Sequence, residues 1–234
     1  MTALFRWPEA AAVGRLIPKE RLYAEGRVTT AVRQRFVDEV QRVRWAYKLG
    51  EESVRLRGSD LVPEVQVFEV ELKGDDLSES VLKTIDKSVP SPIVFELHRT
   101  RCAKPEVQLV AAPKEPGARG VKASSYFRGD WTPTDTQRAA LPPAIDLAGL
   151  YAQLLFALMP LPVRPGEELS VVIDRMTRVR ALEREISTLD KRVRLETQFN
   201  RKVELRRDLR TRQDELEELI NIDQRSTEET TWRN

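Results

Sequence analysis

The sequence predicts an α+β domain followed by a long helical extension, and three observations lead to this fold class. Short segments rich in β-branched and aromatic residues alternate with amphipathic segments up to residue 163. A proline-rich break follows, and residues 167–220 contain no proline or glycine but many charges. The chain has 234 residues, of which 41% are hydrophobic, enough for a real core. We expect an α+β domain over 1–163, a charged helical arm over 166–222 and a disordered tail over 223–234.

The first predicted element is an amphipathic helix that begins at Thr29 or Thr30 and ends near Gly50. Threonine can cap a helix by accepting a hydrogen bond from a backbone N–H of the first turn. The apolar residues that follow recur at spacings of three and four: Val32, Phe36, Val40, Val43 and Tyr47.

The middle of the domain predicts a mixed, mostly antiparallel sheet with packed helices. EVQVFEVEL, residues 64–72, is expected to form a strand. A helix should follow the capping box of Asp76 and Glu79 and stop before Pro90. Three more strands are expected in IVFEL, VQLVA and VKASSYF, which begin at Ile93, Val107 and Val121. Short connections between them favour antiparallel pairing.

The most apolar segment runs from Leu147 to Val163 and contains no charged residue. It is shorter than the roughly 20 residues of a membrane-spanning helix and contains two prolines. We therefore expect a buried core helix, capped by Asp146, and no membrane contact. Because charges and a proline interrupt the amino terminus, it does not resemble a secretory signal, and we expect a cytoplasmic protein.

The arm carries two apolar stripes. The first has the alternating spacing that the seam of a coiled coil requires: Val179, Leu182, Ile186, Leu189 and Val193. The second lies two residues out of step: Leu195, Phe199, Leu209, Leu216 and Ile220. The arm is therefore either one long helix with a shifted stripe or a hairpin that turns near residues 198–200. An exposed seam would cost several kcal/mol, so the same chain, a second copy or a partner helix must cover it.

Composition and motifs exclude several classes of function. The chain has 39 basic and 37 acidic residues, so its formal charge of +2 does not by itself indicate a nucleic-acid-binding protein. A single cysteine, Cys102, and a single histidine, His98, cannot form a zinc site with several thiolates or imidazoles. The sequence contains no nucleophile elbow and no phosphate-binding glycine loop. We expect no cofactor and no metal.

One arrangement of charged residues suggests a catalytic alternative. Nucleases of the restriction-endonuclease type use an acid on one strand and E-x-K on the next. Glu71 and Lys73 supply the triplet, and Asp60 lies upstream. The tripeptide is common and lies at a strand end, where exposed charges are ordinary. These three residues are therefore weak candidates for a metal-dependent catalytic site.

The arm also carries basic residues that fall within one arc of a helical wheel, namely Lys191, Arg194, Arg201, Lys202, Arg206 and Arg212. Such a stripe can follow the phosphates of a nucleic acid. Acidic residues are interspersed, however, and opposite charges three or four residues apart commonly stabilise a solvated helix. Apart from Phe199, which we assign to packing, the stripe lacks aromatic residues that could stack on bases.

Six segments, taken in order, form a recognisable set: AAVGRLIPK, VPEVQVFEVEL, SVPSPIVFEL, SSYFRGDW, PLPVRPGEEL and QFNRKVEL. Together they resemble the bacterial and archaeal family DUF4391, a domain of unknown function. The resemblance spans about residues 5–220 and implies no catalytic residues. It does imply a genomic association with a helicase and a DNA methyltransferase in restriction-modification or antiviral gene clusters.

These observations favour a binding protein over an enzyme. We expect a non-catalytic accessory or adaptor subunit of a DNA-processing complex. The seam formed by Val179, Leu182, Ile186, Leu189 and Val193 would dock a helix of a helicase or methyltransferase, or of a second copy. The alternatives are a metal-dependent nuclease that uses Asp60, Glu71 and Lys73, and a DNA-binding subunit.

Overall fold

The computed structural model describes residues 4–26, 28–117, 120–123, 125–164 and 166–221. The chain forms two compact units, Met1–Met159 and Pro160–Asn234, which we call the body and the arm and describe separately. The boundary between them lies a few residues before the predicted one. The predicted tail over 223–234 is outside the described residues.

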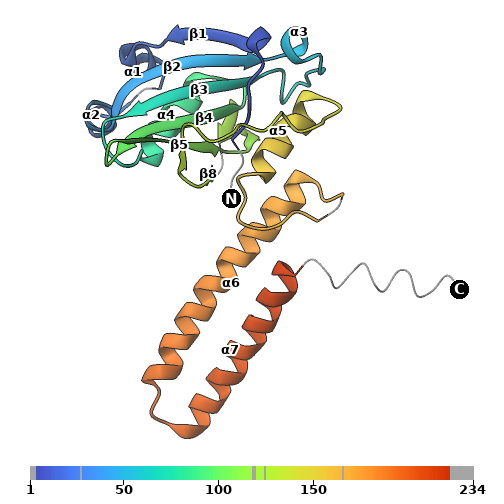
Figure 1. The fold of residues 1–234 in the computed structure, drawn as a ribbon. Coiled ribbons are helices and arrows are strands. Elements are labelled where there is room, and N and C mark those ends of the chain that lie inside the picture. Colours follow the sequence, from blue (N-terminus) through green and yellow to red (C-terminus); the bar gives the residue numbers. More distant parts are fainter. Residues whose placement is uncertain (1–3, 27, 118–119, 124, 165, 222–234) are drawn as a thin grey trace, which may run out of the picture. The chain divides into compact units, whose positions relative to one another are not determined.

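The body contains the mixed, mostly antiparallel sheet that the sequence predicts, so the α+β fold class is confirmed (Figure 1). Seven strands pair in the order β1-β2-β3-β4-β5-β8, and β9 also pairs with β5. Among the described strands of this sheet, only β3 and β4 are parallel, and helix α4 connects them. The strands of this sheet are β1 (Ala12–Leu16), β2 (Val40–Leu49), β3 (Val65–Leu72), β4 (Ile93–Arg101), β5 (Lys104–Ala111), β8 (Phe127–Arg128) and β9 (Thr132–Pro133).

The helices of the body come from both halves of its sequence. They are η1 (Glu9–Ala11), α1 (Lys19–Gly26), α2 (Thr30–Glu39), α3 (Glu51–Val54), α4 (Glu79–Ser88) and α5 (Leu147–Phe156). The Thr29 side chain caps α2, as predicted, and Asp146 caps α5 by accepting a hydrogen bond of 2.7 Å from the Gly149 N–H.

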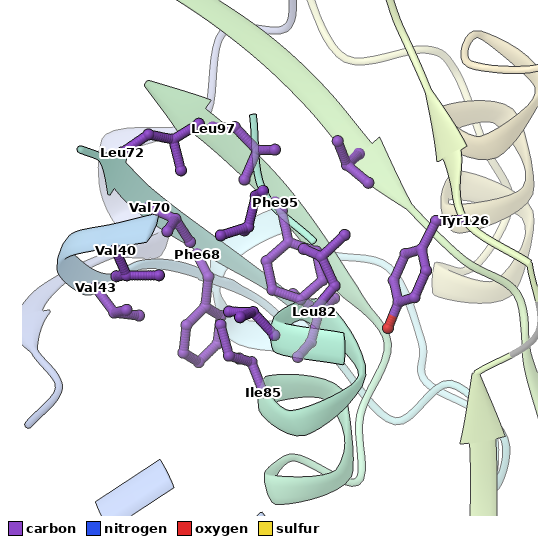
Figure 2. Close-up of a cluster of buried hydrophobic side chains, with 14 of the residues drawn as sticks. Val40, Val43, Phe68, Val70, Leu72, Leu82, Ile85, Phe95, Leu97 and Tyr126 are labelled. Carbon is purple, nitrogen blue, oxygen red and sulfur yellow. The ribbon is translucent and has the colours of Figure 1, made fainter. Parts of the chain in front are cut away.

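One face of the sheet forms the main core of the body. Leu82 and Ile85 of α4 point toward Phe68 of β3 and Phe95 of β4, whose ring centroids are 6.5 Å apart (Figure 2). These side chains are nearly inaccessible to solvent. Because side chains alternate along a strand, the neighbours of Phe68 and Phe95, including Glu69 and Glu96, point to the opposite face.

The opposite face is approached by segments that lie far apart in the sequence. The amino-terminal segment buries Leu4, Phe5 and Trp7, and Phe5 forms a β-bridge with Ala139. From α5, the Tyr151 hydroxyl donates a hydrogen bond of 2.7 Å to the carbonyl of Ala112, just beyond β5. These contacts bring the amino terminus and the loop before α5 onto one sheet.

The predicted helix from Thr29 to Gly50 is wrong beyond Glu39, because the chain continues as strand β2. Val40, Val43, Ala46 and Leu49 are buried at every third position. The pairing of β2 with β3 shifts at two places, between Val40 and Arg42 and between Trp45 and Tyr47. Each shift adds a residue to the two-residue repeat, so the bulged strand resembles a helix in its apolar spacing.

Two other predicted elements differ in extent. VKASSYF does not form one strand: Gly120–Ala123 (β7) pairs with Lys114–Gly117 (β6) in a separate hairpin, and Phe127 starts β8. The apolar helix predicted from Leu147 ends at Phe156 instead of reaching Val163. Among the described residues, no helix has the length and apolar character required to cross a membrane.

The arm is a helical hairpin, which decides between the two predicted arrangements. Helix α6 (Leu169–Leu195) and helix α7 (Phe199–Ile220) lie side by side and antiparallel (Figure 1). The connection is Glu196–Thr197–Gln198, close to the predicted turn.

Candidate functional site

The structure does not bring the three nuclease candidates together. The Glu71 carboxylate forms an ion pair with Arg42, and the Lys73 ammonium donates a hydrogen bond of 2.6 Å to the carbonyl of Val37. Asp60 lies in a turn before β3, whereas Glu71 lies near the end of that strand. Six residue steps separate Val65 from Glu71, about 20 Å along the strand.

Strand β2 carries arginines where a nuclease site would need an acid. Arg42 lies opposite Glu71 in the β2–β3 pairing, and Arg44 lies opposite Glu69. The strand itself, VQRVRWAYKL, contains no acidic residue. A guanidinium group in this place neutralises Glu71 and cannot be a metal ligand. The geometry therefore gives no support to catalysis by Asp60, Glu71 and Lys73.

A different acidic cluster lies on the same face of the sheet. The carboxylate of Glu96, only 2% exposed, accepts hydrogen bonds of 2.7 and 2.9 Å from the two terminal nitrogens of Arg138. It also accepts a hydrogen bond of 2.5 Å from the indole N–H of Trp7. Glu96 thus joins the amino terminus and the loop before α5 to β4.

This environment keeps Glu96 ionised. Burial alone would raise its pKa, but His98, Arg138 and Trp7 together hold the pKa at about 2. His98 Nε2 lies 3.6 Å from Glu96 Oε2, longer than a hydrogen bond, so the guanidinium and indole make the direct contacts.

Glu69, Glu96 and His98 could in principle supply three ligands to a cation, since one ligand atom of each lies within 4.8 Å of the others. Glu69 and Glu96 are register neighbours on β3 and β4. Both Glu96 oxygens already accept hydrogen bonds, and Arg44 lies 3.8 Å from Glu69. Two guanidinium groups thus balance the two carboxylates, and the cluster does not require a cation.

His98 Nε2 is nevertheless a buried atom without a hydrogen-bond partner among the described residues. Its side chain lines a pocket of about 290 Å³ together with Glu69, Glu71 and Thr134. The Oγ1 atom of Thr134 is likewise buried and lacks a partner in the described part of the chain. The exposed Cys102 lies in the β4–β5 turn, where φ is 49°.

In the arm, most of the predicted seam packs inside the hairpin. Val179, Leu182 and Val193 are buried, and Leu205 of α7 is buried as well. Ile186 and Leu189 are half-buried. Ion pairs flank the seam: Arg178 contacts Glu215, and Arg212 Nε lies 3.3 Å from Glu185 Oε2. Of the three possibilities for covering the seam, the same chain therefore covers much of it.

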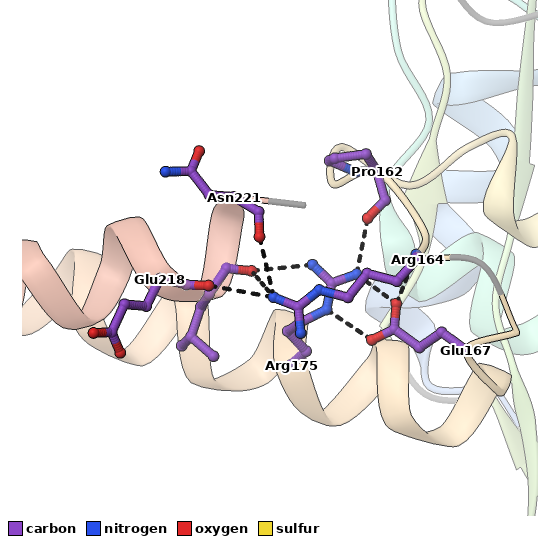
Figure 3. A network of polar contacts seen from close by, with 7 residues as sticks. Pro162, Arg164, Glu167, Arg175, Glu218 and Asn221 are labelled. Carbon is purple, nitrogen blue, oxygen red and sulfur yellow. Dashed lines mark hydrogen bonds and ion pairs between the residues drawn. The ribbon is translucent and has the colours of Figure 1, made fainter. Parts of the chain in front are cut away.

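A polar network closes the end of the hairpin where α6 begins (Figure 3). The buried Arg175 side chain forms hydrogen bonds of 2.8 Å to both carboxylate oxygens of Glu167. It also donates to the carbonyl of Leu219, near the end of α7. Arg164 donates to three carbonyls in the same region, those of Glu218, Leu219 and Asn221. The two arginines thereby satisfy carbonyls that the end of a helix leaves without partners.

Between the two helices lies an open groove with a volume of about 730 Å³, which we call the hairpin groove. Its lining contains apolar, hydroxyl and oppositely charged side chains: Ala181, Arg184, Glu185, Thr188, Leu189, Arg192, Asp208, Thr211 and Arg212. Leu189 is the one member of the predicted seam that lines it. The sequence pattern did not indicate the groove, because its lining combines residues from both helices.

We call the connected end of the hairpin, residues 190–208, the hairpin tip. It contains five of the six residues of the predicted basic stripe: Lys191, Arg194, Arg201, Lys202 and Arg206. Arg194 pairs with Asp190 at 2.7 Å, and Arg201 lies 3.5 Å from Glu196. Arg212 lies farther along α7 and pairs with Glu185 and Glu215. Our assignment of Phe199 to packing is wrong, since its side chain is 77% exposed at this tip.

The comparisons with known proteins identify the family and nothing more specific. Neither the curated proteins nor the solved structures contain a match to this chain. The profile of the family described as Domain of unknown function (DUF4391) matches residues 5–216. That match covers most of both the body and the arm, and the chain therefore belongs to the DUF4391 family.

Proposed function

We propose that this protein is a non-catalytic accessory subunit of a cytoplasmic, prokaryotic DNA-processing assembly. In this proposal the hairpin groove holds a helix of a DNA helicase or a DNA methyltransferase. The observation that carries the proposal is the groove itself. An α-helix about 10 Å wide occupies about 420 Å³ per turn, so a groove of about 730 Å³ can hold nearly two turns.

The lining of the groove suits a polar helix of a partner protein. Leu189 and Ala181 offer apolar contact, while Arg184, Glu185 and Asp208 provide charges of both signs. Laying a helix in a groove between two others is a common mode of recognition, and mixed charges set its register. In the body, the charges of Glu71 and Glu96 are balanced by arginines, which favours a binding role over hydrolysis.

Two threonines of the groove allow a test that leaves the seam intact. Thr188 and Thr211 are exposed and donate hydrogen bonds only to carbonyls of their own helices. The variant Thr188→Tyr with Thr211→Tyr should fill the groove without disturbing the buried seam. Thr177→Tyr is the matched control, because Thr177 is exposed on α6 with the same kind of hydrogen bond but does not line the groove.

The measurement is copurification of the tagged chain, expressed from its native locus, with proteins identified by mass spectrometry. We expect a DNA helicase or DNA methyltransferase with the wild type and with Thr177→Tyr, and loss of it with the double tyrosine variant. Copurification that survives the double variant would show that the groove is not the docking surface. Dimers of the isolated protein that the same variant dissociates would identify a second copy as the occupant instead.

A further inference from the structure

The hairpin tip carries apolar side chains that are exposed instead of packed in the core of the hairpin. Leu195 is 82% exposed, Phe199 77% and Val203 44%. Leu195 ends α6, Phe199 begins α7, and Val203 lies one turn farther along α7. Buried residues such as Val193 and Leu205 lie close by in sequence, so the exposure is confined to one side of the tip.

The same part of the hairpin concentrates positive charge. Residues 190–208 contain seven basic residues (Lys191, Arg192, Arg194, Arg201, Lys202, Arg206 and Arg207) and four acidic ones (Asp190, Glu196, Glu204 and Asp208), which gives +3. The whole chain carries +2, so all other residues together sum to −1. The far half of α7 is acidic, with Asp214, Glu215, Glu217 and Glu218. The charge is therefore a local property of the tip.

Much of this positive charge is available to a ligand. Among the described residues, Lys191, Arg206 and Arg207 form no ion pair, and all three side chains are exposed. The carboxylate of Glu196, by contrast, is engaged within the turn, because it accepts hydrogen bonds of 2.9 Å from the backbone N–H groups of Thr197 and Gln198. These bonds lower its pKa.

We propose that the hairpin tip binds single-stranded nucleic acid, with Phe199 stacked on an unpaired base and the surrounding cations on the phosphates. Five of the seven basic residues are arginines, whose planar groups hold phosphate in a bidentate manner and also stack on bases. An exposed aromatic ring beside such cations is the combination that single strands recognise. The inference rests on the proposed function and deepens it, because it adds a contact with the nucleic acid that the assembly would process. Arg192 and Asp208 of the tip also line the hairpin groove, whereas Phe199, Arg201 and Lys202 do not.

The test is fluorescence anisotropy of the full chain with labelled oligothymidylate and oligouridylate, which distinguish DNA from RNA. Phe199→Ala should weaken binding about tenfold, Phe199→Trp should retain it, and Phe199→Leu should not. Arg201→Gln with Lys202→Gln should reduce the slope of log affinity against log salt by about 1.4, as expected for two lost phosphate contacts. Arg180→Gln with Arg210→Gln removes the same charge away from the tip and should have a smaller effect.

The groove variant Thr188→Tyr with Thr211→Tyr should bind the oligonucleotides as the wild type does, so failure of one proposal is distinguishable from failure of the other. Absence of binding to both oligonucleotides at low salt would overturn the inference. So would equal affinity for duplex DNA, or binding that Phe199→Leu preserves. Binding only to anionic phospholipid vesicles would identify the tip as a membrane contact and would also overturn it.

Discussion

Arg175 and Glu167 form a bidentate ion pair in which the side chains are only 4% and 6% exposed. The same guanidinium donates to the carbonyls of Leu219 and Pro162, at 3.2 and 2.8 Å. One buried charge therefore joins the start of α6 to the end of α7. Arg175 also stabilises the ionised form of Glu167, because its hydrogen bonds lower the pKa of that carboxyl group.

Arg175→Ala should destabilise the hairpin by on the order of 3 kcal/mol, because it leaves Glu167 buried without its counterion. Hydrogen exchange should accelerate throughout α7. Arg178→Ala is the control, because Arg178 forms an exposed ion pair with Glu215 and should change exchange little. If both variants exchanged at the same rate, the buried pair would have no special role.

The ionised Glu96 makes the stability of the body depend on acid. Its pKa falls from 4.5 to about 2 on folding, so its contribution is fully present above pH 4.5 and is lost as the pH falls toward 2. At neutral pH, Glu96→Gln should lower the free energy of unfolding by about 3 kcal/mol. Urea unfolding at several pH values should show this difference shrinking through that window. A difference that stayed constant with pH would contradict the assignment, and the exposed Glu9→Gln should behave as the wild type.

Lys114 is a second buried charge of the body, and its loss should be costly. Its ammonium donates to the carbonyls of Asp86, Val89 and Ser91 at 2.6–3.1 Å and lies 3.1 Å from Asp86 Oδ1. Lys114→Met should reduce the free energy of unfolding by about 3–5 kcal/mol in urea titrations. Lys87→Met, next to Asp86 in sequence but exposed, should have little effect. Equal effects of the two substitutions would count against a role for burial.

Two leucines of α6, one buried and one exposed, test how burial determines the contribution of an apolar side chain to stability. Leu182 is fully buried, so Leu182→Ala should destabilise the chain by about 2–5 kcal/mol. Leu195 is 82% exposed, so Leu195→Ala should change stability by no more than about 0.5 kcal/mol. Thermal unfolding provides the comparison, and a large effect at Leu195 would mean that the tip is packed in solution.

Part of the fold follows directly from local sequence patterns. Val65–Leu72 forms a strand and Asp146 caps a helix, as predicted, because β-branched residues and a capping carboxylate act over a few residues. The helix predicted from Thr29 to near Gly50 fails beyond Glu39, because two bulges give β2 an apolar spacing near three. Bulges depend on the strand that β2 pairs with, and local periodicity contains no information about that partner.

The composition of the candidate sites was harder to predict than the fold, because it depends on tertiary contacts. Glu71 and Lys73 resemble a catalytic pair in sequence, but Arg42 approaches Glu71 from a neighbouring strand. Trp7 and Arg138 reach Glu96 across 89 and 42 residues of sequence. A motif search based on residue spacing could not have found Trp7 and Arg138 as partners of Glu96. The only residue of this cluster that stood out in the sequence was His98, the single histidine.

The sequence by itself determined the α+β class and the helical nature of the arm, and it indicated about where the arm would turn if it folded back, since composition and apolar spacing govern these over short distances. Only the tertiary structure decided that the arm closes as a hairpin, that the seam is largely covered by α7 and that Phe199 is exposed at the tip. Burial is a property of what packs against a side chain. Hence the same apolar pattern produced a core at Leu182 and an exposed surface at Phe199.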